Sequence, residues 1–194
     1  ALAIDEVGVP KRVAMDASML ETVTKKNMKR LKQMAANGSN KYPGMNYIFL
    51  DGNSANNAGS NVKKVNKQGI TEEQADSWII EGAKVKRHII NGDIGLFNRA
   101  PSLHRQSILA MRCKIFETKS LAMNPTVCIP FNADYDGDAM KLHFVQSEEA
   151  IDEAKRLMQL DKNIIHARYG KLTVATDQDQ TSGLYLLSHT DKRR

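Results

Sequence analysis

The sequence Asn132-Ala133-Asp134-Tyr135-Asp136-Gly137-Asp138 places three carboxylates at alternate positions within seven residues. Residues at i, i+2 and i+4 project to one side of an extended or tightly turned backbone, so these carboxylates repel one another unless a cation lies between them. Mg²⁺ takes oxygen ligands, keeps several waters and shares its remaining positions with substrate phosphates. Gly137 fits such a site because a residue without Cβ lets the backbone turn sharply and a substrate approach closely. The stretch therefore predicts a Mg²⁺ site at Asp134, Asp136 and Asp138.

Two other interpretations of this stretch stay open on residue chemistry alone. An EF-hand loop requires Gly at its sixth position and Glu at its twelfth, whereas counting from Asp134 the Gly is fourth and the twelfth residue is Val145. A solvated turn is the most frequent meaning of sequence rich in Asp and Gly. The flanks 126–131 and 140–145 are predicted as strands because they are rich in apolar and β-branched residues. A polar triple between two strands favours a site over a mobile turn.

The rest of the chain alternates strand-like segments with turns, of which Asn91-Gly92-Asp93 gives the strongest signal. Helices are expected after Pro10, over residues 24–36 before Asn37-Gly38, and after Ser147, whose hydroxyl can cap a first turn. We therefore expect a mainly β, α+β chain whose strands form a small barrel. The strand-like segments are 45–50, 85–90, 94–97, 108–115 and 120–131.

Composition sets broad limits on the function. The chain has 194 residues and a net charge of +6, which fits a phosphate-rich partner but decides little. Cys113 and Cys128 lack the spacing of a disulfide framework or a zinc site, so we expect buried thiols in a reducing cytosol. No run reaches the ~18 apolar residues of a membrane span. The chain starts at Ala1 in mid-pattern and reads as a piece of a longer polypeptide, with a polar loop at 51–67.

Other polar residues have both a functional and a structural interpretation. Arg99 stands beside a turn opened by Pro101 and Ser102, where its fork of donors suits phosphate or ribose hydroxyls, and a structural salt bridge is the equal alternative. His104 is interpreted as a structural hydrogen-bonding residue. A basic face on the helix of residues 24–36 is interpreted as a solvated surface in preference to a nucleic-acid contact. Its members are Lys25, Lys26, Lys29, Arg30 and Lys32.

Two long blocks carry a family resemblance. Asn132–Asp138 and the block Gly92–Arg105 resemble the largest catalytic subunit of multisubunit, DNA-dependent RNA polymerases. Ile4–Pro10 and Gln146–Ala150 are similar to archaeal and eukaryotic members more than to bacterial ones. The resemblance covers nearly the whole chain and is weakest over 51–76. Its departures from the family pattern touch none of the expected metal ligands, and they are Ala100, Tyr135 and Val145.

The resemblance implies a fold. It implies a double-psi β-barrel that carries the aspartate loop at one end, with helical insertions and a C-terminal helical extension. Residues 1–146 would form the barrel region, and residues 147–194 would form a helix and the start of a pore-side domain. The family places a further barrel strand upstream of the first residue here, so the barrel is expected to be incomplete unless another chain supplies that strand.

The resemblance also implies an activity. The RNA 3′-hydroxyl would attack the α-phosphate of a nucleoside triphosphate, with catalytic Mg²⁺ on the three aspartates and with Arg99 and Asn132 on the sugar of the nucleotide. Partners would be the DNA template, the RNA 3′ end and the other polymerase subunits, chiefly the second largest, in the cytoplasm. The chain alone is expected to be inactive. A metal-dependent phosphoesterase or nuclease, with His143 as an unconvincing general base, and a structural assembly fragment remain as alternatives.

Overall fold

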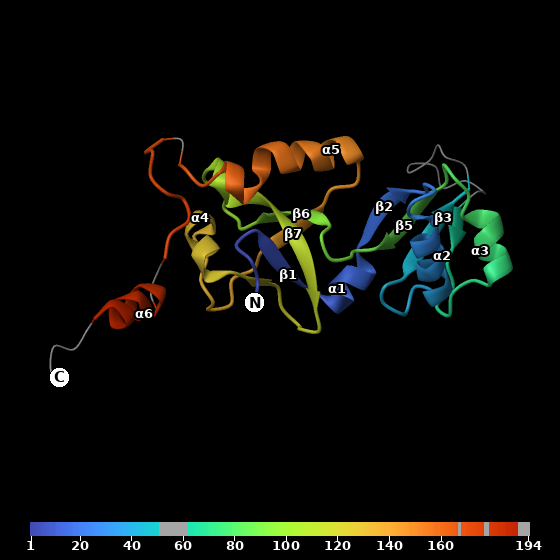
Figure 1. Cartoon of the computed structure of the whole chain (residues 1–194), viewed down its shortest axis with the longest axis horizontal. Helices are drawn as coiled ribbons and strands as arrows, with labels where there is room; N and C mark the ends of the chain where they lie inside the picture. Colours follow the sequence, from blue (N-terminus) through green and yellow to red (C-terminus); the bar gives the residue numbers. More distant parts are fainter. Residues whose placement is uncertain (51–61, 167, 177–178, 190–194) are drawn as a thin grey trace.

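The computed structural model describes residues 1–50, 62–166, 168–176 and 179–189, and Figure 1 shows two sheets with short helices around them. The mixed α+β class predicted from the sequence is confirmed. The strands are β1 (Glu6–Pro10), β2 (Ser18–Thr22), β3 (Met45–Phe49), β4 (Val62–Lys64), β5 (Lys84–His88), β6 (Ile94–Asn98), β7 (Ile108–Phe116), β8 (Ala122–Met123) and β9 (Lys141–Phe144). The α-helices are α1 (Lys11–Asp16), α2 (Met28–Asn37), α3 (Glu72–Trp78), α4 (Cys128–Phe131), α5 (Glu148–Glu153) and α6 (Asp179–Ser188). Shorter helical turns are η1 (Arg105–Ser107), η2 (Pro125–Val127), η4 (Leu160–Lys162) and the π-helical η3 (Ala154–Met158).

The five-stranded sheet holds the core beneath the aspartate loop. Its order is β8-β1-β7-β6-β9, with β1 parallel to β7 and the other neighbours antiparallel. Leu109, Ala110 and Met111 are consecutive and all buried, as expected for a strand covered on both faces. Phe97 on β6 packs edge-on against Phe131 of α4, with ring centroids 5.3 Å apart. This contact fixes α4, which precedes the loop, against the sheet.

The second sheet has its own core. Its order is β2-β5-β3-β4, all antiparallel, and α2 and α3 lie beside it at one end of the molecule (Figure 1). Leu31, Met34 and Ala35 are buried along one stripe of α2, as the helical spacing predicts. The N-terminus of α3 has a capping box, in which Thr71 and Gln74 bond each other's backbone N–H groups. The apolar sides of these helices and one face of the second sheet therefore share a core.

Arg87 joins the two sheets. It is buried on β5 and forms an ion pair with Glu21 of β2. On its other side Nη1 and Nη2 donate to the carboxylate of Asp93 at 2.7 and 2.9 Å. Asp93 lies in the predicted turn before β6 and also accepts from the backbone N–H of Ile90 at 2.8 Å. The turn is thereby held between the second sheet and the strand that leads to Arg99.

The outer face of β6 and β7 is covered by the segment that follows β9. The Ser147 hydroxyl accepts from the N–H of Ala150 at 3.3 Å, which confirms the predicted helix cap. Ile151, Ala154 and Met158 of α5 and η3 pack against these strands. Figure 1 shows α5 along this side of the sheet and α6 away from the main body.

The strand predicted over 126–131 is wrong. The Asn124 side chain accepts from the N–H of Thr126 at 3.1 Å, and Pro125 occupies the first helical position of η2, so the chain turns into η2 and α4. Val127 and Phe131 are both buried and lie four residues apart, which is helical spacing. Of the strand predicted over 120–131, only Ala122–Met123 forms.

The described residues leave one expectation unconfirmed and correct another. Both sheets are open within these ranges, so no closed barrel is formed there and the double-psi β-barrel is not confirmed. The polar loop was predicted over 51–67; residues 51–61 lie outside the described residues, but Val62–Lys64 pairs with β3 as β4, and Val65 is buried. Those residues were misread because a short, Lys-rich edge strand resembles a loop in sequence. No helix in the described ranges is long and apolar enough to cross a bilayer.

Candidate metal centre

The aspartate loop connects α4 to β9 and begins with an unusual backbone turn. Asn132 has φ 47° and ψ 47°, and the chain ends α4 there while backbone N–H groups bond the carbonyls of Cys128 and Ile129. Asn tolerates this left-handed conformation better than most residues with a Cβ. Asn132 therefore redirects the chain from α4 into the aspartates, and its side chain is exposed at the start of the loop.

The three predicted ligands converge. Asp134, Asp136 and Asp138 each offer a carboxylate oxygen, and these oxygens all lie within 4.8 Å of one another. Two hydrogen bonds from backbone to side chain fold the loop. The N–H of Asp136 donates to Asp134 Oδ1 at 3.4 Å, and the N–H of Asp134 donates to Asp138 Oδ2 at 3.2 Å. Asp134 and Asp136 are exposed, whereas Asp138 is half-buried. The loop thus presents its carboxylates together at the protein surface.

Arg99 reaches this loop from β6. It follows Asn98, which is paired with Lys141 at the start of β9. Its Nε donates to Asp138 Oδ2 at 2.7 Å and its Nη2 donates to Asp138 Oδ1 at 3.2 Å, so the guanidinium and the carboxylate form a bidentate ion pair. The structure therefore contains the salt bridge that was the alternative interpretation of Arg99. It also brings Arg99 to the three aspartates, as the functional interpretation requires.

The aspartates have unequal electrostatic environments. The pKa of Asp136 lies above its ordinary value because of its hydrogen bond with Asp134 and the charge of that neighbour. The pKa of Asp138 lies below its ordinary value because Arg99 and then the N–H of Asp134 stabilise its charged form. The charge of Asp138 also raises the pKa of Arg99, chiefly through their hydrogen bond. Arg99 thus neutralises one carboxylate, and the mutual repulsion of the other two remains.

This donor set fits a hard divalent ion. Mg²⁺ binds oxygen at about 2.1 Å, so neighbouring ligand oxygens around one ion lie roughly 3–4 Å apart. The carboxylate oxygens are within 4.8 Å of one another, and the exposed side chains of Asp134 and Asp136 can close that difference by rotation. Their exposure leaves room for the waters and phosphates that Mg²⁺ retains. The loop lacks the bidentate Glu of an EF-hand, since Val145 stands at the twelfth position from Asp134.

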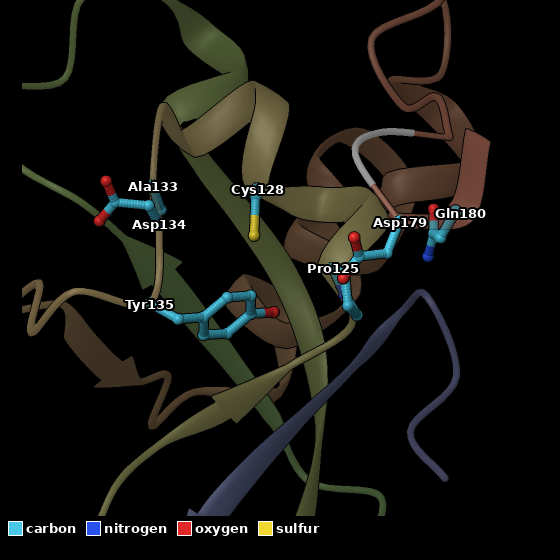
Figure 2. A pocket seen from close by; sticks show the side chains of 7 residues that line it. All are labelled: Pro125, Cys128, Ala133, Asp134, Tyr135, Asp179 and Gln180. Atoms are coloured by element: carbon cyan, nitrogen blue, oxygen red, sulfur yellow. The ribbon is translucent and has the colours of Figure 1, made fainter. Parts of the chain in front are cut away.

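Tyr135 lines two cavities beside the loop. Figure 2 shows its ring extending beneath Cys128 while the carboxylate of Asp134 points away from them. The Tyr135 hydroxyl donates to the carbonyl of Met123 at 3.1 Å, and burial together with Cys128 raises the pKa of Tyr135 to about 12. A cavity of about 310 Å³ lies on the Cys128 side, and another of about 300 Å³ lies on the side of Asp138 and Met140.

Sequence reasoning missed these positions. In the sequence Tyr135 stands out only as a departure from the family pattern, and the sequence predicts a buried thiol at Cys128, whereas Cys128 is half-buried and lines a cavity. The correct signal for Cys128 was the helix start at Asn124-Pro125, which determines which way the thiol points. The prediction of a buried thiol is confirmed for Cys113, where burial raises the pKa to about 12.

Neither His104 nor His143 belongs to the aspartate loop. His104 is exposed; its Nδ1 lies 3.4 Å from the Ser107 hydroxyl, and its ring is 5.7 Å from that of His166. His143 is exposed on β9, between Leu142 and Phe144, which pack against the core of the five-stranded sheet. Because side chains alternate along a strand, His143 points to the opposite face from these two residues.

Comparison with known proteins gives consistent matches. Residues 1–160 match the family described as RNA polymerase Rpb1, domain 2. The chain is 42% identical over 189 residues to DNA-directed RNA polymerase subunit Rpo1N of Thermococcus celer, which amounts to 96% of this chain and 20% of the relative. It is 44% identical over 191 residues to DNA-directed RNA polymerase III subunit rpc1 of Dictyostelium discoideum, or 98% of this chain and 12% of the relative. The chain thus spans about a fifth of the length of the archaeal relative and less of the eukaryotic one.

Proposed function

The chain belongs to the family of the largest RNA polymerase subunits, and we propose that it forms the part of that subunit that holds the catalytic Mg²⁺ during nucleotidyl transfer. The observation that carries the proposal is the convergence of the three loop carboxylates, with oxygens within 4.8 Å of one another. Carboxylates this close repel one another, and a bound cation would relieve that repulsion. Family membership and donor chemistry therefore support the same assignment.

Each residue has a separate task in this proposal. Asp134, Asp136 and Asp138 bind the ion through their carboxylate oxygens, and the exposed side of the loop leaves positions for the substrate. Bound Mg²⁺ stabilises negative charge at the attacked phosphate and lowers the pKa of the RNA 3′-hydroxyl. Arg99 and Asn132 orient the incoming nucleotide by contacting its sugar. Placement and electrostatic stabilisation account for most catalysis of this kind, so the chain needs no general base of its own.

Other components complete the proposed site. The second-largest polymerase subunit, the DNA template, the RNA 3′ end and nucleoside triphosphates are the proposed partners, in the cytoplasm. The exposure of Asp134 and Asp136 supports this assignment, because an ion on that side is open to ligands from outside the chain. The same reasoning predicts that this chain alone does not polymerise.

The five-stranded sheet is proposed to be the described portion of a double-psi β-barrel. Its parallel pairing of β1 with β7, in which Val7 faces Cys113, brings the beginning of the chain beside a strand about a hundred residues later. Such crossed connections are compatible with a barrel that closes when further strands are added. A test is to determine the structure of the chain within the assembled subunit and trace whether hydrogen bonding continues around the sheet from β9 to β8.

The metal assignment is tested by titrating Mn²⁺ into the 194-residue chain and observing paramagnetic broadening by NMR. Broadening centred on the aspartate loop is expected, with weak affinity, because Mg²⁺-type sites take several ligands from water and substrate. A chain with all three aspartates changed to Asn should lose this broadening. Broadening elsewhere, or broadening that survives the triple change, would contradict the site.

The reaction is tested with a primed RNA–DNA hybrid, nucleoside triphosphates and Mg²⁺. Templated extension is expected only when the other polymerase subunits are supplied, and Asp136→Ala should abolish it. Extension by the chain alone that Asp136→Ala abolishes would show a self-sufficient enzyme. Cleavage of the hybrid by the chain alone, with the same dependence on Asp136, would favour the nuclease alternative.

The sugar contact has a separate test in the reconstituted enzyme. Arg99→Ala should reduce the use of ribonucleotides more than that of deoxyribonucleotides, because only the former present a 2′-hydroxyl. A hydrogen bond to a charged group contributes on the order of 1.5–3 kcal/mol, or roughly 10–150-fold in kcat/KM. Equal losses for both substrates would refute the contact.

A further inference from the structure

Arg99 occupies the place of a cation in the aspartate loop. We infer that it acts as an internal counter-ion that a divalent ion must displace, so that metal binding and the release of Arg99 for its substrate are coupled. The inference rests on the proposed function, since it assumes that the loop binds metal. It adds an order of events to that function, in which Arg99 becomes available only after the ion has engaged Asp138.

The hydrogen bonds of Asp138 occupy lone pairs that a metal ion would need. A carboxylate oxygen has two lone pairs. Oδ2 of Asp138 accepts from Arg99 Nε at 2.7 Å and from the N–H of Asp134 at 3.2 Å, which uses both. Oδ1 accepts from Arg99 Nη2 at 3.2 Å. A metal therefore cannot take Oδ2 while both bonds persist, and it can approach Oδ1 only beside the guanidinium.

Electrostatic repulsion opposes the presence of Arg99 and a metal ion on the same loop. The guanidinium lies in hydrogen-bond contact with one of three ligands whose oxygens span only 4.8 Å, so any ion on the loop is close to it. Two cations this close repel each other, and the repulsion is reduced when Arg99 turns away. Binding free energies are reciprocal: if Arg99 on Asp138 weakens metal binding, then metal binding weakens the grip of Arg99 on Asp138 by the same factor.

The position of Arg99 gives the coupling a use. Arg99 follows β6 and 22% of its side chain is exposed, so a ligand beside the loop can reach its guanidinium. The fork that grips a carboxylate also fits sugar hydroxyls. While this fork is bonded to Asp138, its donors are not free to hold a nucleotide. Loading of the ion thus prepares the substrate contact.

The experiment measures Mn²⁺ affinity of the 194-residue chain by water-proton relaxation, and compares Arg99→Gln with Arg112→Gln. Arg112 is a matched control because its Nε and Nη2 grip Asp5 at 2.7 and 3.0 Å, away from the loop. Both changes remove one positive charge, so a general effect of net charge is equal in the two variants. We expect Arg99→Gln to bind Mn²⁺ about five- to tenfold more tightly than the wild type, and Arg112→Gln to bind within about twofold of it.

A second readout needs no variant. The Arg99 Nε–H should exchange slowly with solvent in the metal-free chain, because it is bonded to Asp138, and faster in saturating Mg²⁺ when observed by ¹⁵N NMR. The Nε–H of Arg112 should not change. Arg99→Lys, which keeps the charge but loses the fork, should have a Mn²⁺ affinity between those of the wild type and Arg99→Gln. The exchange measurement decides the inference even where Arg99→Gln fails to fold.

The outcomes separate two failures. If the triple Asp→Asn variant loses Mn²⁺ binding while Arg99→Gln binds no more tightly than the wild type, the metal site stands and the coupling is wrong. An Arg99 Nε–H that exchanges equally with and without Mg²⁺ would overturn the coupling in the same way. If Mn²⁺ binding persists in the triple variant, the proposed metal site itself is wrong, and the inference falls with it.

Discussion

Replacing Arg87 with Met should lower the free energy of unfolding by more than a typical surface substitution does, because Arg87 links the two sheets. Arg87 bridges Glu21 and Asp93, and the three side chains are 7%, 16% and 11% exposed. Removing one partner of a buried ion pair typically costs about 3–5 kcal/mol, because the remaining charge is left uncompensated. Here Glu21 keeps bonds from Asn27 and Arg30, and Asp93 keeps the N–H of Ile90. We therefore expect about 3 kcal/mol, the lower end of that range.

The loss should depend on pH with a defined sign. Burial raises the pKa of Glu21, but hydrogen bonding and charge from Arg87, aided by Arg30, bring it below its ordinary value. Such a carboxyl contributes stability above its ordinary pKa, and this contribution is lost as the pH falls through the folded-state pKa. Without Arg87 the folded-state pKa of Glu21 is higher, so the variant takes up the Glu21 proton at a higher pH than the wild type does. The difference in unfolding free energy between wild type and variant should therefore narrow as the pH falls through the folded-state pKa of Glu21 in the variant and then through that of the wild type, which lies below the ordinary value of 4.5.

Urea denaturation followed by tryptophan fluorescence measures both effects. Trp78 is the only tryptophan and packs against the core of the second sheet. A loss of about 3 kcal/mol corresponds to a drop in Tm of roughly 6–12 °C for a chain of this size. Arg112→Met is the control, because its ion pair with Asp5 is 43% and 34% exposed and should contribute about 0–1 kcal/mol. Equal losses in the two variants, or a gap that widens on acidification, would refute this reasoning.

Three other changes test packing and backbone geometry in the two sheets and at the start of the aspartate loop. Phe97→Ala should cost about 3–5 kcal/mol in thermal unfolding, because the ring is 1% exposed; a loss below about 1 kcal/mol would contradict its place in the core. Asn132→Ala should be about 1 kcal/mol less stable in urea than Asn132→Gly, since φ is 47°; equal midpoints would show that the turn carries no strain. Gly69→Ala should destabilise more than Gly92→Ala, although φ is +92° and +93°, because a Cβ at Gly69 would lie 1.9 Å from a carbonyl of α2 and one at Gly92 meets open space. Similar Tm values for these two would contradict that clash.

Local chemistry in the sequence was sufficient where neighbours in the chain decide the structure. The stripe of Leu31, Met34 and Ala35 predicted α2, and the Ser147 hydroxyl predicted the start of α5. The strands β3, β6, β7 and β9 also follow from their apolar and β-branched residues. Residues 126–131 failed because β-branched composition was weighed above the capping signal of Asn124-Pro125. Capping describes one defined hydrogen bond, whereas β-propensity mostly reflects the surroundings that a strand finds after folding.

Long-range pairing was out of reach of such patterns. The two sheets have separate cores, and nothing local assigns Val23 or Val85 to one and Val7 or Val9 to the other. The parallel partner of β1 lies about a hundred residues away on β7, and a single sequence contains no periodicity that identifies it. The buried Arg87 was likewise unremarkable in sequence, because its partners come from β2 and from a turn. Burial of a charge is decided by tertiary neighbours, which the local pattern does not contain.

The same distinction between local and long-range contacts applies to the candidate site. The three aspartates lie in one loop, so their convergence could be read from spacing, whereas the grip of Arg99 on Asp138 joins residues 39 positions apart. That contact depends on the register of β6 against β9, in which Asn98 faces Lys141 and Gly95 faces Phe144. Gly95 permits the close approach, since a Cβ there would lie 2.7 Å from Leu142. A slip of one residue would turn every β9 side chain to the other face and carry Asp138 away from Arg99. The counter-ion of the loop is thus a property of strand pairing, and the coupling proposed between Arg99 and the metal exists only in the folded sheet.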